Sequence, residues 1–201
     1  MKVALTVPVA AALLYAGIAV ADNTSPSHLL PSELEALESM VPVDMKRFVI
    51  HDEARPFRDK MFLNAEGDEI DLHAFDGHLT LVNLWATWCP PCRKELPGMD
   101  RLKGALADEG LEIVAISLDR GGLKKAGTFW KRAGFDHLEL YADPDKDLAQ
   151  EMGVISLPVT AIVGPDGREI ARMVGDAEWD SDEAQAMLRF LIEKTGVKGS
   201  S

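Results

Sequence analysis

Apolar residues in the middle of the chain gather into short uninterrupted runs that are separated by longer amphipathic segments. Residues 79–85 (LTLVNLW) and 111–118 (LEIVAISL) have the length and composition of buried strands. Residues 90–108 and 122–133 between and after them have the pattern of helices. Strands that alternate with helices in this way indicate parallel pairing in a sheet with helices on both faces.

The second half of the chain changes from this alternation to a β-hairpin followed by a helix. Pro165-Asp166-Gly167 is a turn sequence between two strand-like segments, and Asp180 with Glu183 resembles a capping box at a helix start. In chain order the predicted elements are an extended segment at 138–141, a short helix at 146–152, strands at 159–163 and 168–174, and a helix at 180–194. The whole pattern predicts an α/β fold with a mixed central β-sheet flanked by helices.

An N-terminal extension and a hairpin precede the first buried strand. Residues 62–64 and 69–72 flank the turn-like segment 65–68 (AEGD), which is typical of a β-hairpin. Residues 31–41 carry apolar side chains at helical spacing among glutamates. We interpret this short amphipathic helix as an arm packed on the domain, in preference to a partner-binding helix.

The first residues resemble an export signal. Met1-Lys2 is a short basic start, residues 3–21 are uncharged and mostly apolar, and Ala19-Val20-Ala21 is an A-x-A cleavage site. The same stretch is just long enough to be an uncleaved membrane anchor, and either interpretation places the rest of the chain outside the cytoplasm. The predicted division is a signal peptide or membrane anchor at 1–21, a linker and short helix at 22–45, the main domain at 46–197 and a tail at 198–201.

The charge balance narrows the classes of partner. The chain has 21 Lys and Arg against 33 Asp and Glu, a net charge of −12. A surface of this sign repels phosphate backbones, which argues against nucleic-acid binding. Solubility is the simplest role for the excess of carboxylates, and attraction to basic or metal-bearing partners is the alternative.

The chain has only two cysteines, Cys89 and Cys92, in a single CxxC pair. A disulfide framework would need more cysteines at longer spacings, and a structural zinc site usually needs four N/S ligands. No second CxxC is present, and the histidines are scattered. We therefore predict redox chemistry at a Cys89–Cys92 disulfide, with no metal and no cofactor.

The position of the pair suits thiol–disulfide exchange. Cys89 falls at a predicted helix start, where free N–H groups and the positive end of the helix dipole favour a thiolate. Cys92 follows one turn later, within reach to resolve a mixed disulfide. Pro90 is tolerated in the first turn of a helix, where its missing N–H would have no helical partner. Pro91 cannot offer an N–H to the Cys89 sulfur, so the thiolate is less stabilised and the reduced pair is a better electron donor, which favours a reductase. An inert disulfide is the alternative, but so short a loop would stabilise the fold little.

At this point the sequence resembles a known family. Residues 81–97 (LVNLWATWCPPCRKELP) are similar to the active-site segment of the TlpA-like and ResA-like branch of the thioredoxin superfamily, and residues 175–180 (GDAEWD) resemble TlpA-like proteins. The resemblance, from about residue 62 to about residue 194, implies a thioredoxin-like fold and an exported, periplasmic thiol–disulfide oxidoreductase. It implies clients such as apocytochrome c (cytochrome c-type biogenesis) or copper-site assembly factors, and a membrane thiol-transporting electron donor.

The resemblance also implies roles for single residues. Pro158 matches the superfamily's cis-proline, although an ordinary trans proline at a strand start is the alternative. Glu95 matches an active-site glutamate that could exchange protons with Cys92, although by spacing alone a solvated glutamate is favoured. Asn83 departs from thioredoxin, which has a buried aspartate there, so more of any acid–base role falls on Glu95. The implied substrate-binding residues are Trp88, Pro90, Pro91, Leu157 and Pro158.

Other functions fit the same motif. An oxidase or isomerase would share the fold, and only its reduction potential would separate it from a reductase. A copper-binding oxidase-assembly protein would want a histidine or methionine near the pair, but Met152 and Met173 are more simply core residues. A thiol peroxidase would use a single low-pKa cysteine in a different motif, and we discount it.

Overall fold

The computed structural model describes residues 28–56 and 60–197. The predicted signal peptide or anchor at 1–21 and the tail at 198–201 lie outside these ranges. Within the ranges described, no helix combines the length and apolar character that crossing a bilayer requires.

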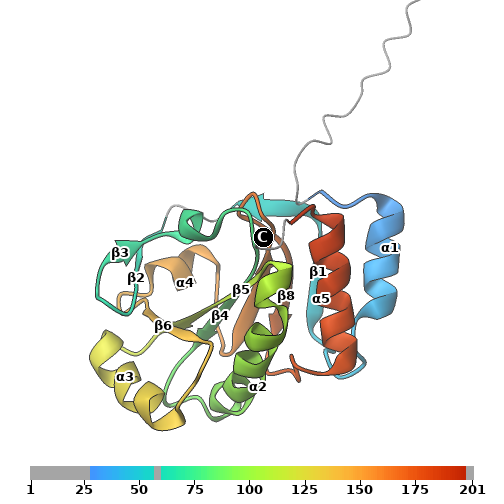
Figure 1. Ribbon diagram of the computed structural model, residues 1–201. Coiled ribbons are helices and arrows are strands. Elements are labelled where there is room, and N and C mark those ends of the chain that lie inside the picture. Colours follow the sequence, from blue (N-terminus) through green and yellow to red (C-terminus); the bar gives the residue numbers. More distant parts are fainter. Residues whose placement is uncertain (1–27, 57–59, 198–201) are drawn as a thin grey trace, which may run out of the picture.

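One mixed sheet of eight strands organises the described part of the chain, in the order β1-β8-β7-β4-β5-β6-β2-β3 (Figure 1). The pairs β4–β5 and β5–β6 are parallel, and the other pairs, including β4–β7, are antiparallel. The strands are β1 Phe48–Pro56, β2 Phe62–Leu63, β3 Glu69–Ile70, β4 Leu79–Trp85, β5 Leu111–Ser117, β6 Glu139–Ala142, β7 Val159–Val163 and β8 Arg168–Val174.

Helices cover both faces of this sheet, as the sequence predicts. They are α1 Pro31–Met40, α2 Pro90–Leu106, α3 Gly122–Ala133, α4 Asp147–Glu151 and α5 Asp182–Lys194, with short 3-10 turns at Leu72–Phe75 and Ala107–Glu109. Side chains of α1, α2, α3 and α5 share one core, and α4 belongs to the core on the opposite face. Helices α2 and α3 share a face because right-handed crossovers join three consecutive parallel strands.

Strand β4 is the centre of the molecule, and every residue in it is buried. Leu81 and Trp85 contribute to the core beneath α2, and Val82 and Leu84 contribute to the core on the other face. Burying each large apolar side chain contributes about 2 kcal/mol. The chain leaves this rigid strand directly into the segment that carries the two cysteines, so the core fixes the position of the pair.

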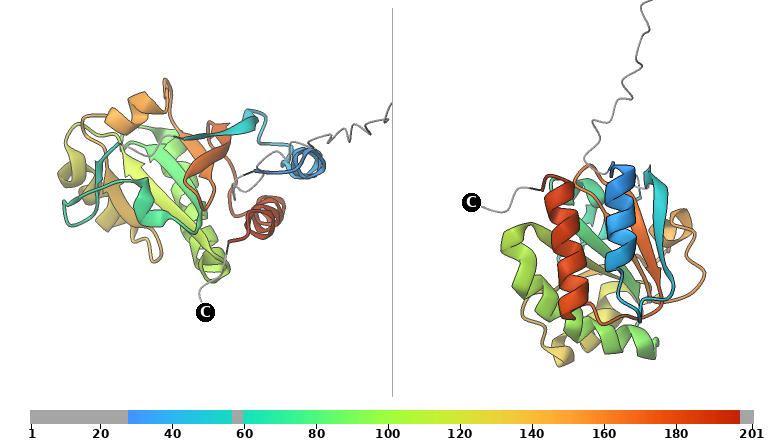
Figure 2. Two further views of the ribbon diagram at one scale, coloured as in Figure 1. Left: turned by 90° about the horizontal axis from the view of Figure 1, so that it is seen from above. Right: turned by 90° about the vertical axis from the view of Figure 1, so that its right-hand side faces the viewer.

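The N-terminal helix α1 packs alongside α5, as Figure 2 shows in its right-hand view. Leu37 of α1 is fully buried. This agrees with the predicted arm packed on the domain.

Two local features differ from the sequence pattern. Strand β1, which the pattern did not single out, is an edge strand paired only with β8, and its side chains are mostly half-buried or exposed. Helix α5 begins at Asp182 rather than at Asp180, because the Ser181 hydroxyl caps it by accepting a hydrogen bond from Ala184 N at 3.2 Å. The predicted capping box of Asp180 and Glu183 is therefore wrong, and Asp180 instead pairs with Arg101.

Candidate active site

Cys89 and Cys92 form a disulfide at the N-terminus of α2, with 5.3 Å between their Cα atoms. Cys89 is the residue that caps the helix, and its sulfur accepts a hydrogen bond from Cys92 N at 3.3 Å. The two cysteines are 3% and 0% exposed, so a partner must contact the neighbouring residues in order to reach the disulfide. The dipole and free N–H groups of a 17-residue helix favour a negative charge on Cys89 once the bond is reduced.

The residues next to the two cysteines in the sequence motif are Trp88, Pro90 and Pro91. Trp88 is 59% exposed and presents its indole to solvent beside the nearly buried Cys89. Pro90 is exposed and Pro91 is half-buried on the first turn of α2. The exposed indole of Trp88 and the two proline rings thus form an apolar surface next to the disulfide.

The peptide bond between Leu157 and Pro158 is cis, as the resemblance implied. Pro158 directly precedes β7, whose first residue is paired with Leu84 near the end of β4. The cis-proline therefore lies beside the strand end from which the cysteine segment departs. Ile155, three residues earlier, is 99% exposed, and Leu157 is half-buried.

Glycine at position 175 joins the cis-proline to the segment that follows β8. Gly175 N donates to Pro158 O at 2.8 Å. Its φ of +103° is one that other residues rarely adopt, and a Cβ there would collide with the guanidinium of Arg47. The segment 175–180, which resembles TlpA-like proteins, therefore starts from a fixed point next to Pro158.

Glu95 is buried on α2, one turn after Cys92, with an exposed fraction of 4%. Its carboxylate accepts hydrogen bonds from Asn83 Nδ2 at 2.9 Å and from Ala177 N at 3.3 Å. Burial raises the pKa of Glu95 to about 7, and the nearby Asp176 adds to the rise, while the donors Asn83, Ala177 and Trp179 oppose it. A carboxyl that titrates near neutral pH can both accept and donate a proton.

Asn83 links Glu95 to the rest of the sheet. Its Nδ2 donates both to Glu95 and to the Thr160 hydroxyl, each at 2.9 Å. Within the described residues, Asn83 Oδ1 and Trp179 Nε1 are buried without a hydrogen-bond partner that meets ordinary geometry. The departure from thioredoxin at position 83 thus supplies a donor to Glu95, where an aspartate would have placed a second carboxylate.

A cleft of about 330 Å³ connects Glu95 with solvent. Two ion pairs line this cleft, Lys94 with Asp176 at 3.5 Å and Arg101 with Asp180 at 2.7 Å. The other lining residues are Gly98, Ala177 and Glu178.

A second buried carboxylate, Asp119, holds the segment before the cysteines. It accepts hydrogen bonds from Thr87 N and Thr87 Oγ1, both at 2.8 Å, and from Ser117 Oγ at 3.1 Å. It also forms an ion pair with Lys125 at 2.9 Å. Burial opposes ionisation of Asp119, but the donors Thr87, Lys125 and Ser117 outweigh it and lower its pKa. The sequence pattern did not single out this residue; its only signal is an acidic side chain just after a buried parallel strand.

Residues that a copper interpretation would need lie elsewhere. Met152 and Met173 are 5% and 3% exposed in the two cores, as core residues are expected to be. Among the described residues, no group of three or more His, Cys, Asp or Glu side chains could hold a metal ion.

A thioredoxin-like sheet with a CxxC disulfide at a helix N-terminus, and a cis-proline before the strand paired with β4, is typical of a class of thiol-redox proteins. Comparison with known families agrees. Residues 44–188 match the family described as Redoxin, so the chain belongs to this family.

Curated relatives narrow the likeness to the ResA-like branch. The chain is 32% identical over 113 residues to the thiol-disulfide oxidoreductase ResA of Bacillus thuringiensis subsp. konkukian, covering 56% of this chain and 64% of that protein. It is 34% identical over 113 residues to the thiol:disulfide interchange protein HelX of Rhodobacter capsulatus, covering 56% and 61%. The match thus spans somewhat less than two thirds of these relatives.

Solved structures support the fold. A putative thiol:disulfide interchange protein DsbE from Chlorobium tepidum has a TM-score of 0.63 at 21% identity, covering 70% of this chain and 98% of that one. A DsbF homologue from Corynebacterium diphtheriae has a TM-score of 0.59 at 23% identity, covering 74% and 93%. At these identities the likeness establishes the thioredoxin-like architecture alone.

Proposed function

We propose that this protein is an exported thiol–disulfide oxidoreductase that reduces disulfides in other exported proteins. The observation that supports the proposal is that three features are tied to the same central strand, β4, which leads into α2, pairs with β7 at Leu84–Val159 and bonds Glu95 through Asn83. The three features are the Cys89–Cys92 pair at a helix start, the cis-proline Pro158, and the buried Glu95 one turn from Cys92.

The reaction begins from the reduced pair. The Cys89 thiolate attacks one sulfur of the client disulfide, forming a mixed disulfide and releasing the other client sulfur as a thiolate, which takes a proton. Cys92 then loses its proton and attacks Cys89, which releases the second client thiol. Two electrons pass to the client, and the protein is left as the Cys89–Cys92 disulfide.

Glu95 is the proposed proton acceptor for Cys92. Residues three apart on a helix share a face, so the carboxyl and the thiol belong to the same side of α2. Because the pKa of Glu95 is about 7, a substantial fraction of the carboxyl is ionised at neutral pH and ready to take the proton. The cleft beside Lys94 and Asp176 then returns the proton to solvent.

Client binding is proposed around the exposed apolar groups. Trp88, Pro90 and Pro91 belong to the segment that carries the disulfide, and Leu157 and Pro158 form the cis peptide bond that precedes β7. An extended client segment next to the cis-proline would pair with the Leu157 backbone in the manner of an added strand. The exposed Ile155 extends this surface, although nothing in the sequence singled it out.

The location, clients and electron donor are proposed from the resemblance. An export signal or anchor at 1–21 would place the domain in the periplasm, where disulfides persist. Clients would be disulfide-bonded proteins such as apocytochrome c or copper-site assembly factors. With two cysteines in the sequence, the pair must be re-reduced by another protein, for which a membrane thiol transporter is proposed.

Trapping of mixed disulfides tests these roles. We expect Cys92→Ser to accumulate a covalent adduct with a disulfide-bonded peptide, and Cys89→Ser to form none and to lose turnover. Mass spectrometry of the adduct under non-reducing conditions is the measurement. Full turnover by Cys92→Ser, or adducts formed through Cys92 in the Cys89→Ser variant, would reverse the assigned roles.

A further inference from the structure

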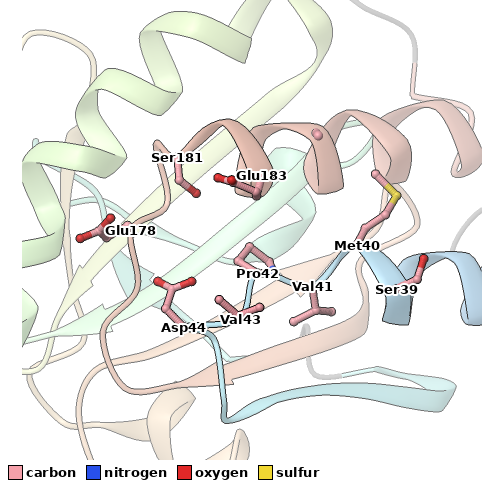
Figure 3. Close-up of a pocket in the computed structure, with 10 residues that line it drawn as sticks. Ser39, Met40, Val41, Pro42, Val43, Asp44, Glu178, Ser181 and Glu183 are labelled. Atoms are coloured by element: carbon pink, nitrogen blue, oxygen red, sulfur yellow. The ribbon is translucent and has the colours of Figure 1, made fainter.

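A groove of about 630 Å³ lies between the end of α1 and the start of α5 (Figure 3). Its floor is apolar, made by the residues that follow α1, and Val43 is 94% exposed. The hydroxyls at its edge are occupied, because Ser39 donates to Ala36 O and Ser181 caps α5. The lining residues are Ser39, Met40, Val41, Pro42, Val43, Asp44, Glu178, Ser181, Glu183 and Ala186.

The charge of the groove has one sign. Asp44, Glu178 and Glu183 are exposed, and Figure 3 shows Asp44 and Glu178 toward one end of the groove, Glu183 nearer its middle, and Met40 toward the other end. No Lys or Arg lines it, and none of the three carboxylates has an ion pair with a residue that the structure describes. In the neighbouring cleft, by contrast, Asp176 and Asp180 are each paired with a cation. The groove therefore offers uncompensated negative charge beside an apolar floor.

The acidic end of the groove adjoins the redox site. Glu178 lines both this groove and the cleft above Glu95. It follows Ala177, which donates to Glu95, and lies three residues after Gly175, which donates to Pro158. Three residues span at most about 11 Å, so the groove begins within that chain distance of the cis-proline loop.

We propose that this groove binds a basic, partly apolar segment of the client protein, a few residues from the client's disulfide. Lysine or arginine side chains would pair with Asp44, Glu178 and Glu183, and apolar side chains would cover Met40 and Val43. Charge complementarity of this kind acts mainly on association rate and partner choice. The inference rests on the proposed reductase function and names the chemistry of its preferred clients.

The test uses synthetic peptides that share one intramolecular disulfide and differ in an adjoining tail. The tails alternate Lys with Leu, Glu with Leu, or Lys with Ser, and 2-hydroxyethyl disulfide serves as a small uncharged substrate. We expect kcat/KM of the reduced protein to be about tenfold higher for the Lys-Leu peptide than for the Glu-Leu peptide, with the Lys-Ser peptide in between. The preference should shrink as salt screens the charges.

Paired variants locate the effect. The double variant Asp44→Asn/Glu183→Gln should lose about fivefold in kcat/KM for the Lys-Leu peptide, chiefly through KM, and keep the wild-type rate with 2-hydroxyethyl disulfide. The matched control Glu35→Gln/Glu151→Gln removes the same charge from exposed positions outside the groove and should leave the peptide preference intact. Val43→Ser should reduce the difference between the Lys-Leu and Lys-Ser peptides.

The outcomes separate two failures. If 2-hydroxyethyl disulfide and every peptide are left unreduced, the proposed function fails. If all are reduced but the Lys-Leu and Glu-Leu peptides react equally, or the control variant loses as much as the groove variant, the docking inference is overturned. Sedimentation that shows a dimer broken by Val43→Ser would also overturn it, because the groove would then be covered by a second copy.

Discussion

The segment that carries the cysteines is flanked by two buried carboxylates that behave oppositely. Glu95 and Asp119 are 4% and 0% exposed, and burial alone would raise the pKa of both. Asp119 receives two hydrogen bonds from Thr87, one from Ser117 and an ion pair from Lys125, and its pKa is lowered. Glu95 receives fewer donors and no cation, and its pKa rises to about 7.

The difference fits a supporting role for Asp119 and the proton-transfer role that is proposed for Glu95. A carboxylate surrounded by donors stays ionised and holds Thr87 in place, two residues before Cys89. A carboxyl that is buried with too few donors is poised to move a proton. Two differences separate the two residues: Glu95 lies deeper in the protein, and Asp119 has more donors, one of them a cation.

The largest expected effect that separates the two carboxyls is on the pH dependence of stability. Because the pKa of Glu95 rises from 4.5 to about 7 on folding, the folded protein keeps a proton between these pH values that the unfolded chain has released. The free energy of unfolding should therefore fall by about 3 kcal/mol as pH rises through this range. Urea unfolding of the wild type and of Glu95→Gln at several pH values measures this fall in the free energy of unfolding. The part of the fall that comes from Glu95 should be absent in the variant. Parallel pH profiles for both proteins would contradict the account.

The next effect is on rate. Glu95→Gln keeps the size of the side chain and removes the proton acceptor, so the release of client after the mixed disulfide should slow by about thirtyfold. Its pH profile should lose the inflection near 7 that the wild type shows. Stopped-flow measurement of client thiol release follows this step. Asp119→Asn should keep that inflection, and a loss of the inflection there would blur the distinction between the two residues.

A smaller effect is the structural cost of replacing the permanent anion. Asp119→Asn should lower the free energy of unfolding by about 1–2 kcal/mol, because the charge-assisted hydrogen bonds to Thr87 and Ser117 weaken. Guanidinium unfolding at neutral pH is the measurement. At the same pH Glu95→Gln should lower the free energy of unfolding by less than Asp119→Asn does. The reverse order would contradict the view that burial disfavours the ionised form of Glu95.

The smallest effect concerns the cation. The Lys125 side chain is 53% exposed, so its ion pair with Asp119 is partly screened by water. We expect Lys125→Met to change the free energy of unfolding by less than about 1 kcal/mol. A loss as large as that of Asp119→Asn would show that the cation, rather than the Thr87 donors, holds the carboxylate.

The sequence predicts the central elements well, because their pattern is local. The bounds of β4, α3, β7 and β8 agree with the apolar runs and helical spacing read from the chain. The edge strand β1 has no such pattern, since its side chains are not sorted into a buried and an exposed face. Ser181 caps α5 in place of the expected Asp180, which is drawn to Arg101, a residue distant in sequence.

The site divides in the same way. Cys89 and Cys92 follow from a motif that is readable in the chain, and the cis-proline follows from the family resemblance, whereas the burial of Glu95 follows from neither. By spacing, Glu95 resembles a solvated helix residue next to Arg93 and Lys94. It becomes buried because the distant segment carrying Ala177 and Trp179 folds over α2. Asp119 is likewise defined by a partner, Thr87, that lies 32 residues away.

The reduction potential of the Cys89–Cys92 couple tests the central claim most directly. It is measured by equilibrating the protein from Asp22 onward with glutathione or dithiothreitol buffers and quantifying the oxidised fraction. We predict a value near or below about −200 mV, toward the thioredoxin end of the range, as a reductase fed by another protein requires. A value near about −120 mV would mark a disulfide-forming oxidant and would contradict the proposed reductase function.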